Sequence, residues 1–206
     1  MDAKTHTIKL KYFNDYLKFQ GYSLVGNSFW GARIVNFAKY NDIRVIIKRD
    51  KRDGTQDLVE NEILEKFKGL DRIPQKLLFE QDLLSKGILN SKKPVSFFKK
   101  FLIEYHISLE NRFLVESFIP GKEYNYESLS TTEEQKLIDL VSTFHKAGYA
   151  RLDLGKADNF ILNSKGELYL VDLGQFIKKD DPQFNLEKDY DLYYLDEMLG
   201  KSRGKK

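Results

Sequence analysis

The chain has 206 residues, of which 41% are hydrophobic and 32% are charged, and its formal net charge is +3. A chain of this size and composition folds into one globular domain or two small lobes, and it is too apolar to be intrinsically disordered. The absence of cysteine excludes disulfides, zinc–thiolate sites and thiol nucleophiles.

A glycine-containing turn lies between two β-type stretches, residues 22–25 and 32–37. Gly26 and Gly31 bound the turn, and Ser28 lies between them. Glycine lets backbone N–H groups approach phosphate oxygens, so the turn is a candidate phosphate-binding loop. A plain turn is the alternative, because Gly-Asn-Ser is itself a turn signal.

An apolar, β-branched strand at residues 43–48 ends in Lys48, and a helix is predicted to follow at residues 57–68. The helix carries the carboxylates Glu60 and Glu62. Its apolar residues recur at helical spacing; they are Leu58, Ile63, Leu64 and Phe67. A strand lysine that reaches only solvent is the alternative interpretation of Lys48.

A longer stretch separates this helix from the next strong pattern. Residues 74–80 are predicted to form a strand and residues 81–89 a helix. Residues 92–100 read Lys-Lys-Pro-Val-Ser-Phe-Phe-Lys-Lys, a basic and aromatic patch. The pattern favours an ordinary amphipathic insertion. The functional alternative is that the patch docks an anionic acceptor or a membrane surface.

Two further strands are predicted at residues 102–109 and 112–118, and Pro120 and Gly121 end the second one. A capping box that starts at Ser130 then begins a helix over residues 132–147. Its predicted buried stripe is Leu137, Leu140, Val141 and Phe144. His145 on this helix is interpreted as a surface or capping residue and not as a base.

Residues 151–174 read R-L-D-L-G-K-A-D-N-F-I-L-N-S-K-G-E-L-Y-L-V-D-L-G. Asp153 lies on a short loop, and Asn159 precedes an apolar strand. A turn at Gly166 leads into a second apolar strand, which ends at Asp172. A β-hairpin with acidic turns and no chemistry is the alternative, because D-L-G and D-N are common loop dipeptides.

A last helix is predicted around residues 189–195 and contains Asp191. Taken in chain order, these segments resemble the protein-kinase superfamily, including its catalytic loop and its D-F-G segment. The resemblance implies an α+β, bilobal kinase-like fold. Its N-lobe, residues 1–119, would hold an antiparallel sheet plus one helix, and residues 120–206 would form a truncated, mainly helical C-lobe.

The resemblance also implies ATP and Mg²⁺ as cofactors and suggests roles for particular residues. Lys48 would hold nucleotide phosphates, with Glu62 as its ion-pair partner and Glu60 as the alternative. Asp153 would position the acceptor hydroxyl, and Asp191 would accept backbone N–H groups of the catalytic loop. Residues of the glycine turn and backbone groups of the hinge would contact the nucleotide: Gly26, Ser28, Gly31, Glu116 and Phe118. The implied metal ligands are Asn159 and Asp172, with Asp158 as the alternative to Asn159.

The chain departs from the common kinase pattern in ways that narrow the resemblance. Asn159 lies one residue further from Asp153 than the H-R-D-x-x-x-x-N pattern places it, and Arg151 and Leu173 replace the usual His and Phe. No Ala-Pro-Glu segment follows Gly174. The chain therefore resembles small atypical kinases, either the Kdo and heptose kinases of the lipopolysaccharide core or the KEOPS-associated and RIO-like type.

The implied function is transfer of the γ-phosphoryl group of ATP to a hydroxyl. The missing peptide-docking segments and the basic patch favour a sugar on an anionic glycolipid as acceptor, with a protein Ser or Thr left open. A nucleotide-binding pseudokinase scaffold is the rival function, and a nucleic-acid partner is disfavoured because no stacking motif accompanies the basic residues. Without a signal peptide or a transmembrane run, a cytoplasmic location with peripheral membrane contact is expected.

Overall fold

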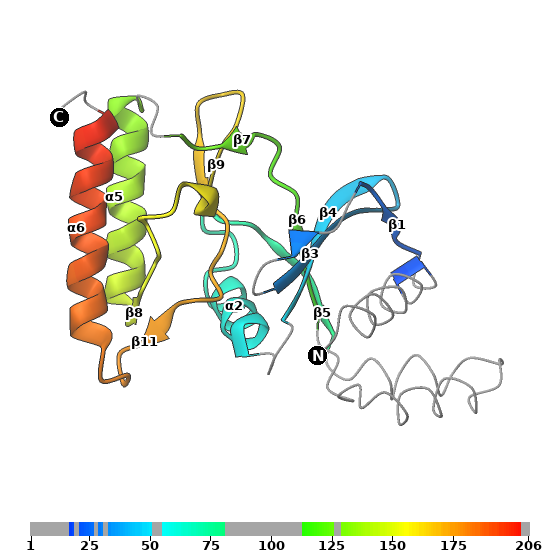
Figure 1. Ribbon diagram of the computed structural model, residues 1–206, viewed down its shortest axis with the longest axis horizontal. Helices are drawn as coiled ribbons and strands as arrows, with labels where there is room; N and C mark the ends of the chain where they lie inside the picture. The colour runs from blue at the N-terminus through cyan, green and yellow to red at the C-terminus, as the bar shows by residue number, and fades with distance from the viewer. Residues whose placement is uncertain are drawn as a thin grey trace. The chain divides into compact units, whose positions relative to one another are not determined.

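The computed structural model describes residues 17–18, 21–26, 29–30, 33–50, 55–80, 113–125 and 129–202. The chain forms two compact units (Figure 1). Residues 1–57 and 76–118 belong to the first unit, and residues 58–75 and 119–206 belong to the second. The described ranges contain antiparallel sheets and three α-helices, which confirms the predicted α+β class.

The first unit is built on one antiparallel sheet with the strand order β1-β3-β4-β6-β5, in which β2 also pairs with β3. The strands are β1 (Ser23–Leu24), β2 (Phe29–Trp30), β3 (Arg33–Tyr40), β4 (Ile43–Asp50), β5 (Lys76–Glu80) and β6 (Phe113–Ser117). A tight turn through Asn41 and Asp42 joins β3 to β4. Their φ angles are 48° and 64°, and two-residue turns with positive φ are favoured in hairpins because their twist matches that of the strands.

The β-branched run of β4 forms this sheet because alternate residues can pack on one face while the backbone bonds its neighbours. Val45 and Ile47 are buried on that face and pack with residues from other parts of the unit. The cluster consists of Leu17, Tyr22, Ala38, Val45, Ile47 and Val115. The predicted strand at residues 74–80 is present as β5. The predicted strand at 102–109, the helix at 81–89 and the basic patch at 92–100 lie outside the described residues.

The second unit contains the three helices α2 (Thr55–Lys66), α5 (Thr131–Lys146) and α6 (Phe184–Ser202). Helices α5 and α6 lie side by side (Figure 1). One small sheet joins β7 (Lys122–Glu123), β9 (Phe160–Leu162) and β10 (Leu168–Leu170), and another joins β8 (Tyr149–Ala150) and β11 (Ile177–Lys178). From residue 58 onward α2 belongs to this second unit.

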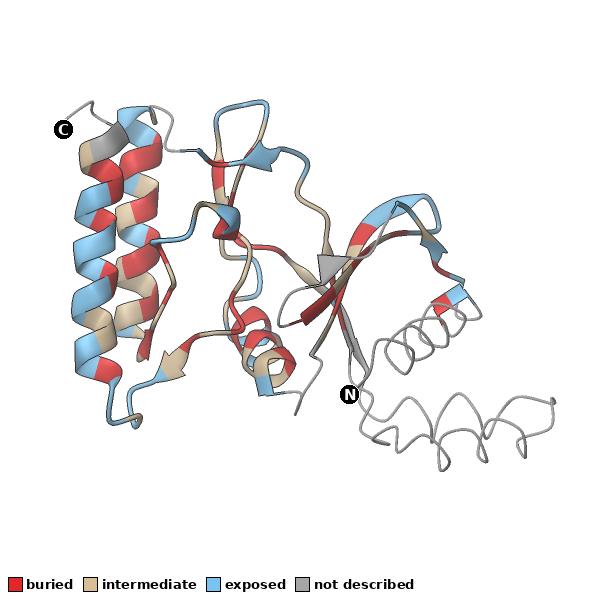
Figure 2. Cartoon of the chain, in the orientation of Figure 1, coloured by how far each residue is buried: buried red, intermediate tan, exposed pale blue. Residues whose placement is uncertain are grey.

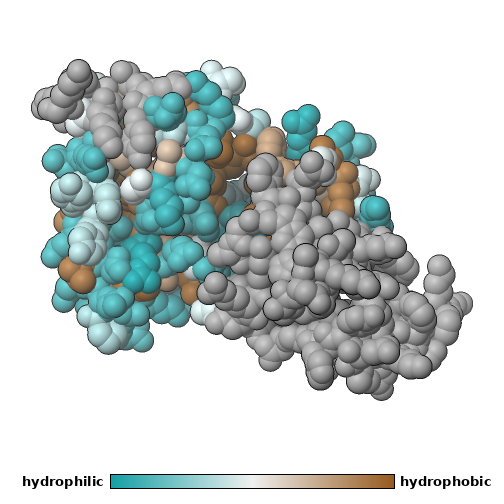
Figure 3. Space-filling model, in the orientation of Figure 1, coloured by the Kyte–Doolittle hydropathy of each residue, from teal (hydrophilic) through white to brown (hydrophobic). Residues whose placement is uncertain are grey.

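Helix α5 follows its predicted pattern closely. Ser130 caps it by accepting the Glu133 N–H at 3.2 Å. All four members of the predicted apolar stripe are buried, as the red side of the helix in Figure 2 shows. The visible face of this unit is mostly hydrophilic (Figure 3), as expected for the outer side of amphipathic helices. Within the described ranges, no helix combines the length and the apolarity needed to cross a bilayer.

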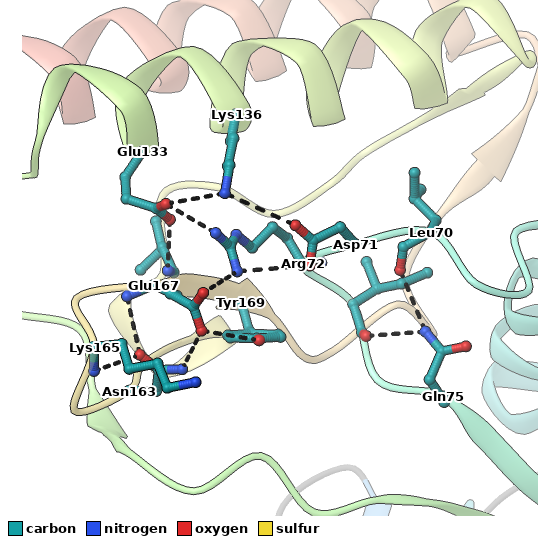
Figure 4. A network of polar contacts seen from close by, with 12 residues as sticks. Leu70, Asp71, Arg72, Gln75, Glu133, Lys136, Asn163, Lys165, Glu167 and Tyr169 are labelled. Atoms are coloured by element: carbon teal, nitrogen blue, oxygen red, sulfur yellow. Dashed lines mark hydrogen bonds and ion pairs between the residues drawn. The ribbon is translucent and has the colours of Figure 1, made fainter.

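Arg72 connects three parts of the second unit (Figure 4). Arg72 lies in the loop that follows α2, it is buried, and its guanidinium bonds Glu133 on α5 at 2.9 Å. It also lies 3.3 Å from Glu167 in the β9–β10 hairpin. The Arg72 carbonyl accepts the Leu170 N–H at 2.9 Å, and Glu133 accepts the Leu168 N–H at 3.1 Å. The loop after α2, the start of α5 and the hairpin are thus fixed to one another.

Replacing Arg72 should show how much this network contributes. In Arg72→Met the buried Glu133 carboxylate loses its guanidinium partner, so the free energy of unfolding should fall by about 3 kcal/mol in urea titrations. Lys136→Ala is the matched control, because Lys136 also contacts Glu133 but is 41% exposed, and it should cost less than about 1 kcal/mol. Equal losses in the two variants would contradict this account of the network.

Candidate functional site

The loop between β8 and β9 has an uncommon backbone conformation. Arg151 and Asp153 have φ angles of 61° and 54°, in the left-handed region that non-glycine residues rarely adopt. Each such residue costs on the order of 1–3 kcal/mol unless its surroundings hold it in place. The Leu152 N–H between them donates to Asp191 Oδ1 at 2.8 Å, and Arg151 bonds Glu187 at 2.6 Å. Both acceptors lie on α6, so this helix holds the loop.

Asp191 is itself held by a second partner. Its other carboxylate oxygen lies 3.0 Å from His145 Nε2 on α5. Both side chains are buried, with 6% of His145 and 4% of Asp191 exposed. The predicted bond from the loop backbone to Asp191 is therefore present, but the interpretation of His145 as a surface or capping residue is wrong. Because α5 and α6 pack together, the histidine ring faces the carboxylate and not solvent.

Asn159 is fixed against the backbone of the same loop. Its amide nitrogen donates to the Asp153 carbonyl at 3.0 Å, and the residue is 5% exposed. A single 3₁₀ turn, Ala157–Asn159, leads into β9. Asp158 within that turn is exposed. The amide nitrogen of Asn159 is thus engaged by the backbone, which leaves its oxygen as an acceptor on a rigid group.

Asp172 follows β10 and begins the Asp-Leu-Gly segment. Its Oδ1 accepts the Gly174 N–H at 3.4 Å, and the Leu173 N–H donates to Glu60 at 3.1 Å. Glu60 on α2 is completely buried. Helix α2 therefore contacts the Asp-Leu-Gly backbone through Glu60.

Glu62 on the same helix has other partners. It accepts the Tyr149 hydroxyl at 2.9 Å and lies 2.7 Å from Lys178, with 47% of its side chain exposed. The hydrogen bond from Lys178 holds the pKa of Glu62 below its usual value. Burial, helped by Glu62, raises the pKa of Tyr149 to about 12. Within the second unit Glu62 thus joins α2 to β8 and β11.

Lys156 is a site residue that sequence reasoning missed. Its Nζ lies 2.6 Å from Asp153 Oδ2. This hydrogen bond raises the pKa of Lys156, and the charges of Asp153, Asp158 and Asp172 raise it further. The sequence feature that could have revealed it is the spacing: Lys156 lies three residues after Asp153 in the same short loop, and a turn of that length brings the two side chains together. Asp153, Asp158 and Asp172 are thus near enough to Lys156 to act on its charge.

A divalent cation fits the chemistry of these groups. Among the residues that the structure describes, no three or more His, Asp or Glu side chains gather at metal-ligand spacing. Mg²⁺ does not need such a cage, since it is usually bound by one or two protein oxygens together with substrate phosphates and water. Asn159 and Asp172 provide one amide oxygen and one carboxylate that suit this mode of binding.

In the first unit, Lys48 pairs with a residue of the neighbouring strand. Its Nζ lies 3.0 Å from Glu116 Oε2, and the two side chains are 7% and 0% exposed. Lys48 is opposite Leu114, and Glu116 is opposite Ile46, so the lysine and the acid share one face of the sheet. The sequence predicted backbone contacts at Glu116; it missed this side-chain role because strand register decides it.

The remaining predicted nucleotide contacts are only partly described. The Phe118 N–H is 3.4 Å from the Arg44 carbonyl, and Gly26 has the positive φ of 72° that favours glycine. Ser28 and Gly31 lie outside the described residues. The pairing of Lys48 with an acid of α2 would join the two units and stays a prediction.

Hydrogen exchange can test how Asp191 holds the loop. Asp191→Ala removes the acceptor of the Leu152 N–H, so exchange of that amide should accelerate on the order of tenfold or more, the equivalent of one lost buried hydrogen bond. Asp191→Asn keeps an oxygen at this position and should retain most of the protection. An unchanged Leu152 exchange rate in Asp191→Ala would show that the loop is held by other contacts.

Comparison with known proteins assigns no family to the chain. No model of a protein family matches it, and no curated protein matches it. The candidate site in the second unit therefore rests on the positions of its own residues, Asp153, Lys156, Asn159 and Asp172. The Lys48–Glu116 pair of the first unit is a separate observation.

Proposed function

We propose that the protein is a small kinase-like phosphotransferase, which uses ATP and Mg²⁺ to phosphorylate a hydroxyl group. The observation that carries the proposal is the bond from the Asn159 amide to the Asp153 carbonyl, in a loop that also holds Lys156. Phosphoryl transfer needs little covalent chemistry from the protein and depends on positioning and charge. This loop offers one carboxylate, one amide oxygen and one ammonium on a fixed backbone.

The proposed roles follow from the chemistry of each group. Asp153 orients the acceptor hydroxyl and takes its proton as the oxygen attacks phosphorus. Lys156 offsets negative charge on the transferred phosphoryl group. Asn159 and Asp172 hold Mg²⁺, which when bound neutralises charge on the phosphate oxygens. In the first unit, Lys48 is the group suited to binding phosphate oxygens.

Glu60 is the acid of α2 that supports the site best. It is buried and bonded to the Leu173 N–H, whereas Glu62 is half exposed and bonded to Lys178. We therefore assign to Glu60 the role of orienting the Asp-Leu-Gly segment.

The two acids can be separated by substitution. Glu60→Gln should lower kcat for phosphate transfer by on the order of tenfold or more, because it weakens the charge at a positioned group. Glu62→Gln should change kcat less than threefold, on the order expected when an exposed ion pair is lost. Phosphate transfer from labelled ATP measures both, and a larger loss in Glu62→Gln would reverse the assignment.

A nucleotide-binding pseudokinase is the second candidate function. It is favoured by the buried Lys48–Glu116 pair, because the carboxylate neutralises the ammonium and would repel a phosphate placed beside it. Tight binding of Mg-ATP without any phosphate transfer would favour this candidate.

Activity should depend on Asp153 and Asp172, the acids that precede and follow the β9–β10 hairpin. Asp153→Ala and Asp172→Ala should each lower the rate of phosphate release or transfer from γ-labelled ATP by about 100-fold or more. Asp158→Ala is the matched control, because Asp158 is exposed in the same loop, and its rate should stay within about threefold of the parent rate. Full activity in both of the first two variants would refute the proposal.

The acceptor class is tested in the same assay. A glycolipid core, generic protein substrates and the enzyme itself are supplied in parallel with labelled ATP. The proposal of a sugar acceptor predicts label in the glycolipid, and it predicts less label when Lys92, Lys93, Lys99 and Lys100 are neutralised, because these lysines would attract an anionic substrate. Label that enters only protein, whatever the charge of these positions, would contradict a sugar acceptor.

A further inference from the structure

Helix α6 is apolar on two opposite sides. One side is buried against the rest of the second unit and carries Phe184, Leu195, Met198 and Leu199. The other side is exposed (Figure 2), and five of the nine exposed large hydrophobic residues among the described ones lie on this helix. They are Leu186, Tyr190, Leu192, Tyr193 and Tyr194, with exposures of 54%, 50%, 46%, 63% and 38%. Helices with this pattern are usually covered on both sides.

The exposed side is acidic as well as aromatic. At helical spacing it presents one continuous stripe, which we call the outer face of α6: Leu186, Asp189, Tyr190, Tyr193, Asp196 and Glu197. All six residues are exposed. The stripe contains three carboxylates and no basic residue. An apolar stripe with a charged border is typical of a protein-binding surface and not of a face adapted to solvent alone.

Charge decides which occupant fits. Two outer faces placed against each other would bring like charges together, which destabilises a complex. A basic segment with large apolar residues is complementary. The chain carries one at residues 92–101, Lys-Lys-Pro-Val-Ser-Phe-Phe-Lys-Lys-Phe, which has four lysines, three phenylalanines and no acid. Residues 92–101 lie outside the described residues, so their complementarity to the outer face of α6 is inferred from the sequence alone.

We propose that the outer face of α6 binds residues 92–101 of a second copy of this chain. The phenylalanines bury the tyrosines and Leu186, and the lysines pair with Asp189, Asp196 and Glu197 at the border. A twofold dimer makes this contact twice, because each copy offers both surfaces. Salt weakens the association because the border pairs are exposed to solvent.

Analytical ultracentrifugation of the full chain tests the proposal. Between about 1 and 100 µM the sedimentation coefficient should rise with concentration, as for a dimer of micromolar affinity, and the rise should be smaller in 0.5 M salt, where the Debye length is roughly 4 Å. One variant reverses the α6 charges (Asp189→Lys, Asp196→Lys, Glu197→Lys). Another reverses the basic run (Lys92→Glu, Lys93→Glu, Lys99→Glu, Lys100→Glu). Each alone should weaken self-association by on the order of tenfold or more.

Mixing the two reversed variants is the decisive step. In the mixed dimer both contacts again join opposite charges, one with the native polarity and one with the polarity reversed, so the mixture should associate more tightly than either variant alone. Asp42→Lys with Glu123→Lys is the matched control, because both residues are exposed acids outside α6, and this variant should associate like the parent. Circular dichroism confirms that every variant is folded. A chain that stays monomeric, self-association that survives the α6 reversal, or a mixture that fails to associate would each overturn the proposal.

Discussion

A buried carboxylate, Asp191, determines the conformation of the loop on which the candidate site depends. One oxygen accepts the Leu152 N–H and the other bonds His145, so a single side chain joins α6, α5 and the loop. The left-handed residues on either side of Leu152 are costly on their own. They persist because contacts with α6 hold the loop in place, the Leu152 N–H bond to Asp191 and the Arg151 bond to Glu187. The direction of Asp153 and the position of Asn159 both follow from this conformation.

The parts of the fold that the sequence predicted are those set by local periodicity. Helix α5 begins at its capping serine and buries its predicted stripe, and the β9–β10 hairpin forms around Gly166. The bond to Asp191 was also predicted, because an acid on the last helix resembled a residue that serves the catalytic loop in kinases. The choice of Asn159 over Asp158 as metal ligand stays a prediction. Each of these inferences needs only neighbouring residues or a recognisable order of segments.

Side-chain partners that depend on register or on tertiary packing were missed. Glu116 faces Lys48 because of the alignment of β4 with β6, which composition does not reveal. Arg72 looks like an ordinary loop arginine until α5 and the hairpin are brought around it. Helical spacing alone does not say whether Glu60 or Glu62 is turned inward, since both lie on a helix with apolar residues on either side. His145 was misjudged for the same reason, because its partner lies on a helix distant in sequence.

The most direct test of the account is whether the chain binds ATP through Mg²⁺ at Asn159 and Asp172. Calorimetric titration with ATP, with and without Mg²⁺, measures this independently of any acceptor. The account predicts binding that is tighter with Mg²⁺, and a Mg²⁺ effect that is largely lost in Asp172→Asn and in Asn159→Ala but kept in Asp158→Ala. Failure to bind ATP, or an affinity that is the same with and without Mg²⁺ in the parent chain, would contradict it.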